Sequence, residues 1–99
     1  MNIKNKKFVF TGALITMSRK QAQALVLSLG GKIQKSISKS TTVLVIGNFQ
    51  GDLLTGRISS KKIEAAQKRN EKKHFITIID EKKFLSLIIE DLNLLHRNL

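Results

Sequence analysis

The sequence contains no cysteine, no proline, no tryptophan and no tyrosine. Without cysteine the chain can form no disulfide framework, no cysteine-ligated zinc site and no thiol nucleophile, which fits a reducing compartment. Without proline, glycine is left to make most of the turns. The two histidines, His74 and His96, are isolated from any second ligand at metal-binding spacing. We therefore expect no metal site.

Acidic residues are also scarce, because seven Asp and Glu stand against 18 Lys and Arg, for a formal net charge of +11. No carboxylate precedes Asp52, so the charged residues of the first half are all cationic. A second basic cluster runs from Arg57 to Lys73, whereas the segment from Asp80 is nearly balanced. This distribution favours a polyanionic partner, such as nucleic acid or a phosphoprotein. The alternative is a charge that serves only solubility.

Long apolar runs are missing as well. No segment is long enough to cross a bilayer, and no signal-peptide apolar region follows the basic stretch 1–7. We expect an intracellular protein without a membrane partner, located in the cytoplasm or nucleoid if the source is bacterial. A 41% apolar fraction is typical of a globular chain, and 99 residues suit one domain over 1–99.

Catalytic motifs are not found. The glycines form neither a Walker motif nor a dinucleotide fingerprint, and neither histidine has a serine and an aspartate at a recognisable spacing. The few carboxylates offer no convincing acid–base pair. We therefore expect a protein that is not an enzyme, with no cofactor and no small-molecule substrate.

Hydrophobic patterning predicts four strands and three helices in the order β-α-β-β-α-β-α. The expected strands are residues 7–10, 32–37, 43–46 and 75–79. The expected helices are residues 18–29, 60–69 and a last one capped by Asp80. The uninterrupted apolar run 43–46 is typical of a strand covered on both faces. The pattern therefore indicates an α/β fold, a small parallel sheet with helices on both faces.

Local signals at the first helix are clear. Ser18 followed by Gln21 forms a capping-box pattern, and Gly30 with Gly31 ends the helix. The expected core includes four phenylalanines and an apolar stripe on the last helix. These residues are Phe8, Phe10, Phe75, Phe84, Leu87, Ile88, Leu92 and Leu95.

Short segments along nearly the whole chain resemble the BRCT family. They are Phe8–Gly12, Arg19, Leu29–Ile33, Ser38–Val45, Lys61–Ala66 and Ile78–Phe84. The nearest likeness is to the single BRCT domain of bacterial NAD-dependent DNA ligases. Two departures are Phe84, where many members have tryptophan, and a longer, more basic segment before the fourth strand. The resemblance implies a three-layer, four-stranded parallel sheet in the order 2-1-3-4 with three helices, and a docking role in DNA repair or replication.

The resemblance also implies a phosphate pocket. The family pocket uses a hydroxyl at the end of the first strand, the next backbone N–H and a lysine at the start of the second helix. These match Thr11, Gly12 and Lys62, with Lys61 as the alternative if the register shifts by one. Arg19 is a second candidate cation. The structural alternative is that Thr11 and Gly12 only form a turn and that the lysines are solvated.

Outside the pocket, Lys68 and Arg69 begin a basic cluster that extends to Lys73 and that either follows a DNA backbone or is merely solvated. Phe49 falls in a predicted loop, where it either packs locally, stacks on a base or inserts in a partner. Three functions remain open. The first is binding of DNA at ends, nicks or a 5′-phosphate. The second is protein docking, to a phosphoprotein or to another BRCT domain through positions such as Leu94 and Leu95. The third is a small basic α/β domain of another fold that merely coats nucleic acid, ribosomal RNA included.

Overall fold

The computed structural model describes residues 2–47 and 61–99. Four strands form one parallel sheet in the order β2-β1-β3-β4. The strands are β1 (Lys7–Thr11), β2 (Lys32–Ile33), β3 (Val43–Ile46) and β4 (Thr77–Asp80). The helices are α1 (Arg19–Ser28), α3 (Lys61–Glu71) and α4 (Glu81–Arg97). The predicted α/β fold and its strand order are confirmed.

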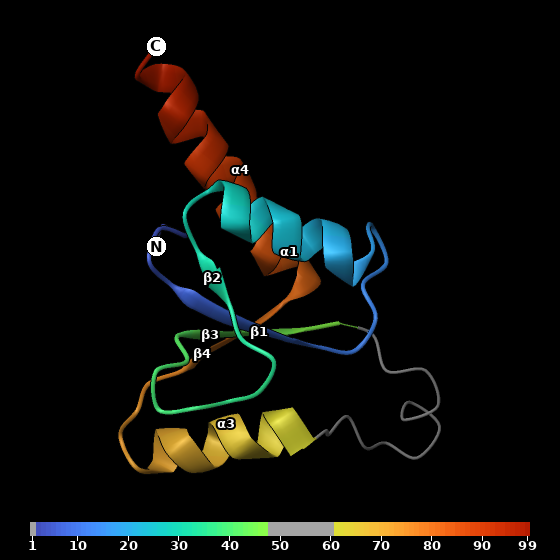
Figure 1. Cartoon of the computed structure of the whole chain (residues 1–99), viewed down its shortest axis with the longest axis vertical. Coiled ribbons are helices and arrows are strands. Elements are labelled where there is room, and N and C mark those ends of the chain that lie inside the picture. Colours follow the sequence, from blue (N-terminus) through green and yellow to red (C-terminus); the bar gives the residue numbers. More distant parts are fainter. Residues whose placement is uncertain (1, 48–60) are drawn as a thin grey trace.

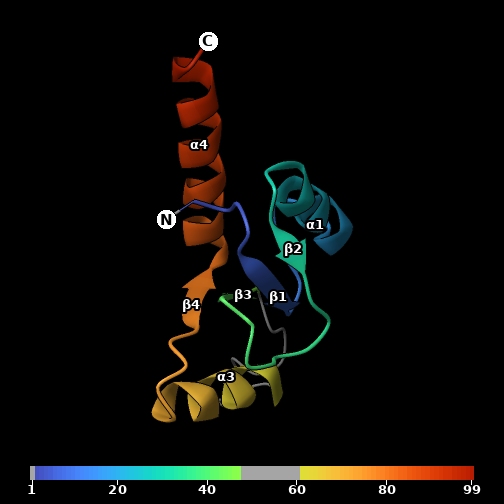
Figure 2. The same ribbon diagram turned by 60° about the vertical axis from the view of Figure 1, so that its left-hand side comes forward.

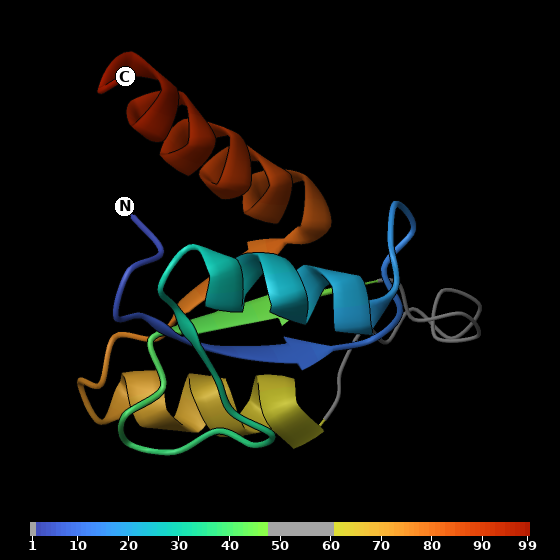
Figure 3. The same ribbon diagram turned by 45° about the horizontal axis from the view of Figure 1, so that its top comes forward.

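The sheet separates two apolar layers. Figures 1 and 3 show α1 and α4 over one face of the sheet and α3 under the other. Because side chains alternate along a strand, Phe8 and Phe10 of β1 point into the α1–α4 layer and Val9 points into the α3 layer. The continuous apolar run of β3 follows from this arrangement, since both of its faces are covered.

The two ends of α1 are built by local sequence, as predicted. The Ser18 hydroxyl accepts the Gln21 N–H at 3.1 Å, and the Gln21 side chain accepts the Ser18 N–H at 2.9 Å. At the other end Gly30 has φ +87°, and the Gly31 N–H donates to the Val26 carbonyl at 2.9 Å. This is a Schellman ending, in which glycine takes the left-handed position at no steric cost.

The α3 helix ends in the same way without glycine. Lys73 has φ +67°, the His74 N–H donates to the Arg69 carbonyl, and the Lys73 N–H donates to the Asn70 carbonyl, both at 3.0 Å. Lysine therefore occupies the left-handed position that Gly30 takes in α1. A residue with a Cβ costs about 1–2 kcal/mol in that conformation.

Replacing Lys73 by glycine should therefore stabilise the protein. We expect Lys73→Gly to raise the free energy of unfolding by about 0.5–1 kcal/mol, because relief of the strain exceeds the entropy that glycine loses on folding. Urea denaturation followed by circular dichroism measures the change. Lys72→Gly is the matched control, since it removes the same charge just before this position and should destabilise. Equal effects of the two substitutions would contradict the strained geometry.

The prediction for the fourth strand is wrong at its first residues. The strand begins at Thr77, and Phe75 is not in the core but 79% exposed, with φ +50°. The cause is the Asn70 side chain, which donates to the Ile76 carbonyl at 2.9 Å and accepts the Ile76 N–H at 2.6 Å. This pair of hydrogen bonds fixes Ile76 as the buried residue and leaves Phe75 outside the core.

The second strand is shorter than predicted, because it covers only Lys32–Ile33. Beyond it the Gln34 N–H still donates to the Phe8 carbonyl of β1 at 2.9 Å, and the polar side chains that follow bond one another. The Gln34 side-chain amide N–H donates to the Ser40 hydroxyl at 2.9 Å, and its amide oxygen accepts the Thr41 hydroxyl at 2.6 Å. Polar side chains that bond locally compete with a strand ladder in this way. The polar residues between β2 and β3 therefore form hydrogen bonds with one another.

The predicted stripe of α4 is correct only in its first half. Phe84, Leu87 and Ile88 are buried, whereas Leu92 and Leu95 are 49% and 57% exposed. Figure 2 shows the reason, because the C-terminal half of α4 projects beyond the sheet and has no layer beneath it. Phe49 and the predicted loop 48–56 lie outside the described residues.

Candidate functional site

The end of β1 forms the floor of the candidate site. Thr11 is 6% exposed and lies opposite Ile46 of β3. Its carbonyl accepts the Gly47 N–H at 2.8 Å, which ties the ends of the two strands together. Gly12 follows with φ +79°, a conformation that favours glycine. The chain therefore turns sharply at Gly12 into the loop of residues 13–18.

Lys62 reaches this floor from the opposite layer. It lies in the first turn of α3, and Figure 1 shows that end of α3 near the end of β1 that leads into α1. Its ammonium donates to the Phe10 carbonyl at 2.8 Å, and its side chain is half-buried. The first turn of a helix also carries a partial positive charge. A cation is thereby fixed beside Thr11.

Arg19 is a second cation at the same place. Its guanidinium donates to the Gly12 carbonyl at 2.8 Å. Burial and, after it, the positive charge of Arg19 lower the pKa of Lys62 below its usual range. The Arg19 charge thus disfavours the charged form of Lys62, while each cation donates to a neutral carbonyl. An anion bound between them would offset this effect.

The structure divides the predicted site residues into two groups. It brings together Thr11, Gly12, Arg19 and Lys62, with Lys61 exposed on the same helical turn. Lys68 and Arg69 lie in the last turn of α3, at the opposite end of that helix (Figure 1). These two basic residues are therefore separate from the Lys62 site.

One residue of the site escaped prediction. Glu81, the first residue of α4, accepts the Ile15 N–H and the Thr16 N–H at 2.8 Å each and the Thr16 hydroxyl at 2.6 Å. It thereby holds the loop that joins Gly12 to Arg19. The one sequence signal for Glu81 is its position next to the predicted helix cap Asp80. The Asp80 side chain accepts the Lys83 N–H at 2.8 Å.

The Glu81 contacts predict a pH effect. Burial raises the pKa of the Glu81 carboxyl, but the hydrogen bonds from Ile15 and Thr16 outweigh it, so the net pKa is lowered. A carboxyl with a lowered pKa stabilises the fold above its unfolded-state pKa, and this stabilisation is lost as the pH falls through the folded-state value. We expect Glu81→Gln to cost about 1 kcal/mol at pH 7, after allowance for solvent exposure, and to flatten the loss of stability below pH 5.

Urea denaturation at several pH values measures this effect. Glu90→Gln is the matched control, because Glu90 is exposed on the same helix and the substitution removes the same charge. It should leave both the stability at pH 7 and its acid dependence close to wild type. If Glu81→Gln behaves like Glu90→Gln, the loop is not held by the carboxylate.

Within residues 2–47 and 61–99, no helix is long and apolar enough to span a membrane. In the same ranges, no three His, Cys, Asp or Glu residues gather in a way that could hold a metal ion.

Known proteins resemble the chain over most of its length. It is 40% identical over 91 residues to a DNA ligase of Coprothermobacter proteolyticus, which covers 92% of the chain and 12% of that ligase. It is 41% identical over 83 residues to a DNA ligase of Syntrophotalea carbinolica, which covers 84% of the chain and 10% of that ligase. The chain thus spans about a tenth of the length of these relatives. The family model of the BRCA1 C Terminus (BRCT) domain matches residues 2–88, and together with the 2-1-3-4 sheet this shows that the chain belongs to the BRCT family.

Proposed function

We propose that the chain is a non-catalytic module that recognises phosphate on DNA, at an end, a nick or a 5′-phosphate, in DNA repair or replication. The observation that carries this proposal is the pair of neighbouring cations, Lys62 and Arg19, held on the carbonyls of Phe10 and Gly12. A phosphate monoester offers close to two negative charges and three acceptor oxygens. It could therefore bond both cations at once, which a carboxylate does less well.

Two further findings support DNA as the partner. The net charge of +11 favours a polyanion, and the relatives reported above are DNA ligases. The Thr11 hydroxyl and the Gly12 N–H are the proposed directional donors, because these residues lie at or between the two carbonyls that hold the cations. No catalytic group is required, since positioned donors and charge are sufficient for binding.

The test is a fluorescence-anisotropy titration with short duplexes that differ only in a 5′-phosphate, at two salt concentrations. We expect the phosphorylated end to bind about tenfold tighter, with affinity for both duplexes falling steeply as salt rises. Equal affinity for the two ends would refute the pocket. If charge reversal at Lys68 and Arg69 then abolishes binding, a diffuse basic patch is the better description.

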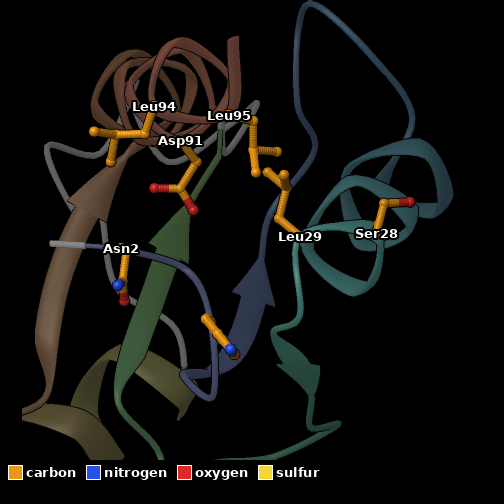
Figure 4. Close-up of a pocket in the computed structure, with 7 residues that line it drawn as sticks. Asn2, Ser28, Leu29, Asp91, Leu94 and Leu95 are labelled. Carbon is orange, nitrogen blue, oxygen red and sulfur yellow. The ribbon is translucent and has the colours of Figure 1, made fainter. Parts of the chain in front are cut away.

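Protein docking is a second candidate, favoured by the projecting end of α4. Leu94 and Leu95 are 49% and 57% exposed. Together with Leu29 at the end of α1 they line a cavity of about 250 Å³ (Figure 4). Asp91 lies in the same cavity. Its Oδ2 accepts the Ile3 N–H at 2.9 Å, but its buried Oδ1 has no hydrogen-bond partner among the described residues. The apolar wall formed by the leucines suits apolar side chains of a partner, whereas the buried Asp91 Oδ1 is shielded from contact with it.

Light scattering over a range of protein concentrations separates these functions. A dimer that Leu95→Glu dissociates, without loss of DNA binding, would support docking of a second copy on α4. A monomer at all concentrations would leave only a different protein as the docking partner.

A further inference from the structure

Phe75 stands apart from the other phenylalanines of the described chain. Phe8, Phe10 and Phe84 are between 0% and 3% exposed, whereas Phe75 is 79% exposed. It also has φ +50°, a conformation that a bulky residue rarely adopts. A large apolar side chain is therefore presented to solvent by a strained backbone, and the core makes no use of it. Strain of this kind is found at functional sites when the surroundings enforce it.

The surroundings of Phe75 do enforce it. On one side, the Schellman ending of α3 closes over Lys73, with hydrogen bonds from Lys73 and His74 to carbonyls of the helix. On the other side, two hydrogen bonds from Asn70 fix Ile76, whose side chain is 4% exposed in the α3 layer. Phe75 lies between these fixed points. The ring is thus presented from a preorganised turn, which lowers the entropy cost of binding to it.

The charge around the turn identifies the kind of ligand. From the start of α3 to Phe75 there are six basic residues against two acidic ones, Glu64 and Glu71. Lys72, Lys73 and His74 directly precede the ring, and all three are exposed. Lys68 and Arg69 lie in the last turn of the helix. An exposed aromatic ring among cations is the arrangement that binds single-stranded nucleic acid, in which bases stack on the ring and phosphates contact the cations.

We propose that Phe75 is a stacking platform for an unpaired base of DNA, with Lys72 and Lys73 contacting the phosphates on either side of that base. This inference rests on the proposed function only in taking DNA as the partner. The site itself is a different one, since the stretch of α3 from Lys62 to Glu71 separates it from the phosphate pocket by about 14 Å. A strand that left the pocket along α3 would pass its basic residues and arrive at Phe75.

The experiment compares a blunt duplex with one that carries a single-stranded overhang, both bearing a 5′-phosphate. We expect Phe75→Ala to weaken binding of the overhang duplex by about 5- to 150-fold, the range that loss of one base–aromatic stack produces. Binding of the blunt duplex should be unchanged. Leu27→Ala is the matched control, because Leu27 is 58% exposed on α1 and its truncation should alter neither affinity.

A second variant reports on stacking directly. The chain has no tryptophan or tyrosine, so Phe75→Trp introduces a single indole fluorophore. We expect its emission to be quenched on addition of the overhang duplex, with affinity at least equal to wild type. Because Phe75 is exposed, both variants should fold, which circular dichroism verifies.

Three outcomes would overturn the inference. They are unchanged binding of the overhang by Phe75→Ala, an equal loss for both duplexes, and an indole that the overhang duplex does not quench. If the wild-type protein still prefers a 5′-phosphate while Phe75→Ala has no effect, the stacking site fails and the pocket stands. If the wild-type protein shows no such preference but Phe75→Ala still weakens binding of the overhang duplex, the pocket fails and the stacking site stands.

Discussion

Replacing Phe84 by alanine is expected to lower the free energy of unfolding by about 3–5 kcal/mol. The Phe84 side chain is fully buried and meets two rings of β1 edge to face. Its ring centroid lies 5.4 Å from that of Phe10 and 6.3 Å from that of Phe8. Truncation removes both aromatic contacts and leaves a cavity between α4 and the sheet. Domains of this size are stable by about 5–15 kcal/mol, so about a fifth or more of the stability would be lost.

The matched comparison is Phe75→Ala, the same substitution at a residue that is 79% exposed. It should change the free energy of unfolding by no more than about 0.5 kcal/mol. Far-UV circular dichroism in urea measures both variants, and a thermal scan of Phe84→Ala should show a midpoint at least about 12 °C lower. A cost for Phe75→Ala near that for Phe84→Ala would mean that Phe75 packs in the core after all.

The contrast between these two phenylalanines shows what can be predicted from the sequence. Phe84 follows a capping aspartate and shares a helical period with Leu87 and Ile88, so its burial was predictable. Phe75 begins a run of five residues with no alternation, so the pattern does not say where the strand starts. The start is set by the Asn70 side chain and by the ending of α3, in which Lys73 takes the left-handed position that glycine usually occupies.

The same division applies to the site. Motifs whose residues lie close together in the sequence, such as Ser18 with Gln21 or Thr11 with Gly12, could be predicted from the sequence. Glu81 was not, because it bonds a loop 65 and 66 residues earlier in the sequence. Asp91 interrupts the apolar stripe of α4, yet it is buried and accepts the N–H of Ile3, which lies 88 residues earlier. Such contacts depend on the assembled layers and leave no local pattern.

Helical phase decides between the two candidate lysines. Ile63 and Ala66 are the buried residues of α3, and Lys62 precedes Ala66 by one helical turn, so its side chain begins at the edge of the buried face. Lys61 is exposed, whereas Lys62 is half-buried and reaches the Phe10 carbonyl. We therefore expect Lys62, and not Lys61, to contact the bound phosphate.

Lys62→Ala should accordingly abolish the preference for a 5′-phosphorylated end, lowering affinity for that end about tenfold while affinity for the unphosphorylated end changes little. Lys61→Ala is the control, since it removes the same charge one residue earlier. It should weaken binding of both duplexes slightly and equally, and the preference for the 5′-phosphorylated end should remain. Anisotropy titrations of the two variants at one fixed salt concentration provide the comparison. If instead Lys61→Ala abolishes the preference and Lys62→Ala keeps it, Lys61 is the lysine that contacts the phosphate.

The pH dependence of the same titration tests the mechanism. In the free protein, burial and the charge of Arg19 lower the pKa of Lys62. A bound phosphate is an opposite charge and raises that pKa again, so binding is coupled to proton uptake between the two values. Affinity for the phosphorylated end should therefore fall as the pH rises through this alkaline range, and Lys62→Ala should remove that fall. Below about pH 6 the phosphate itself loses charge, so affinity should fall for both proteins. An alkaline fall that persists in Lys62→Ala would assign the contact to another lysine.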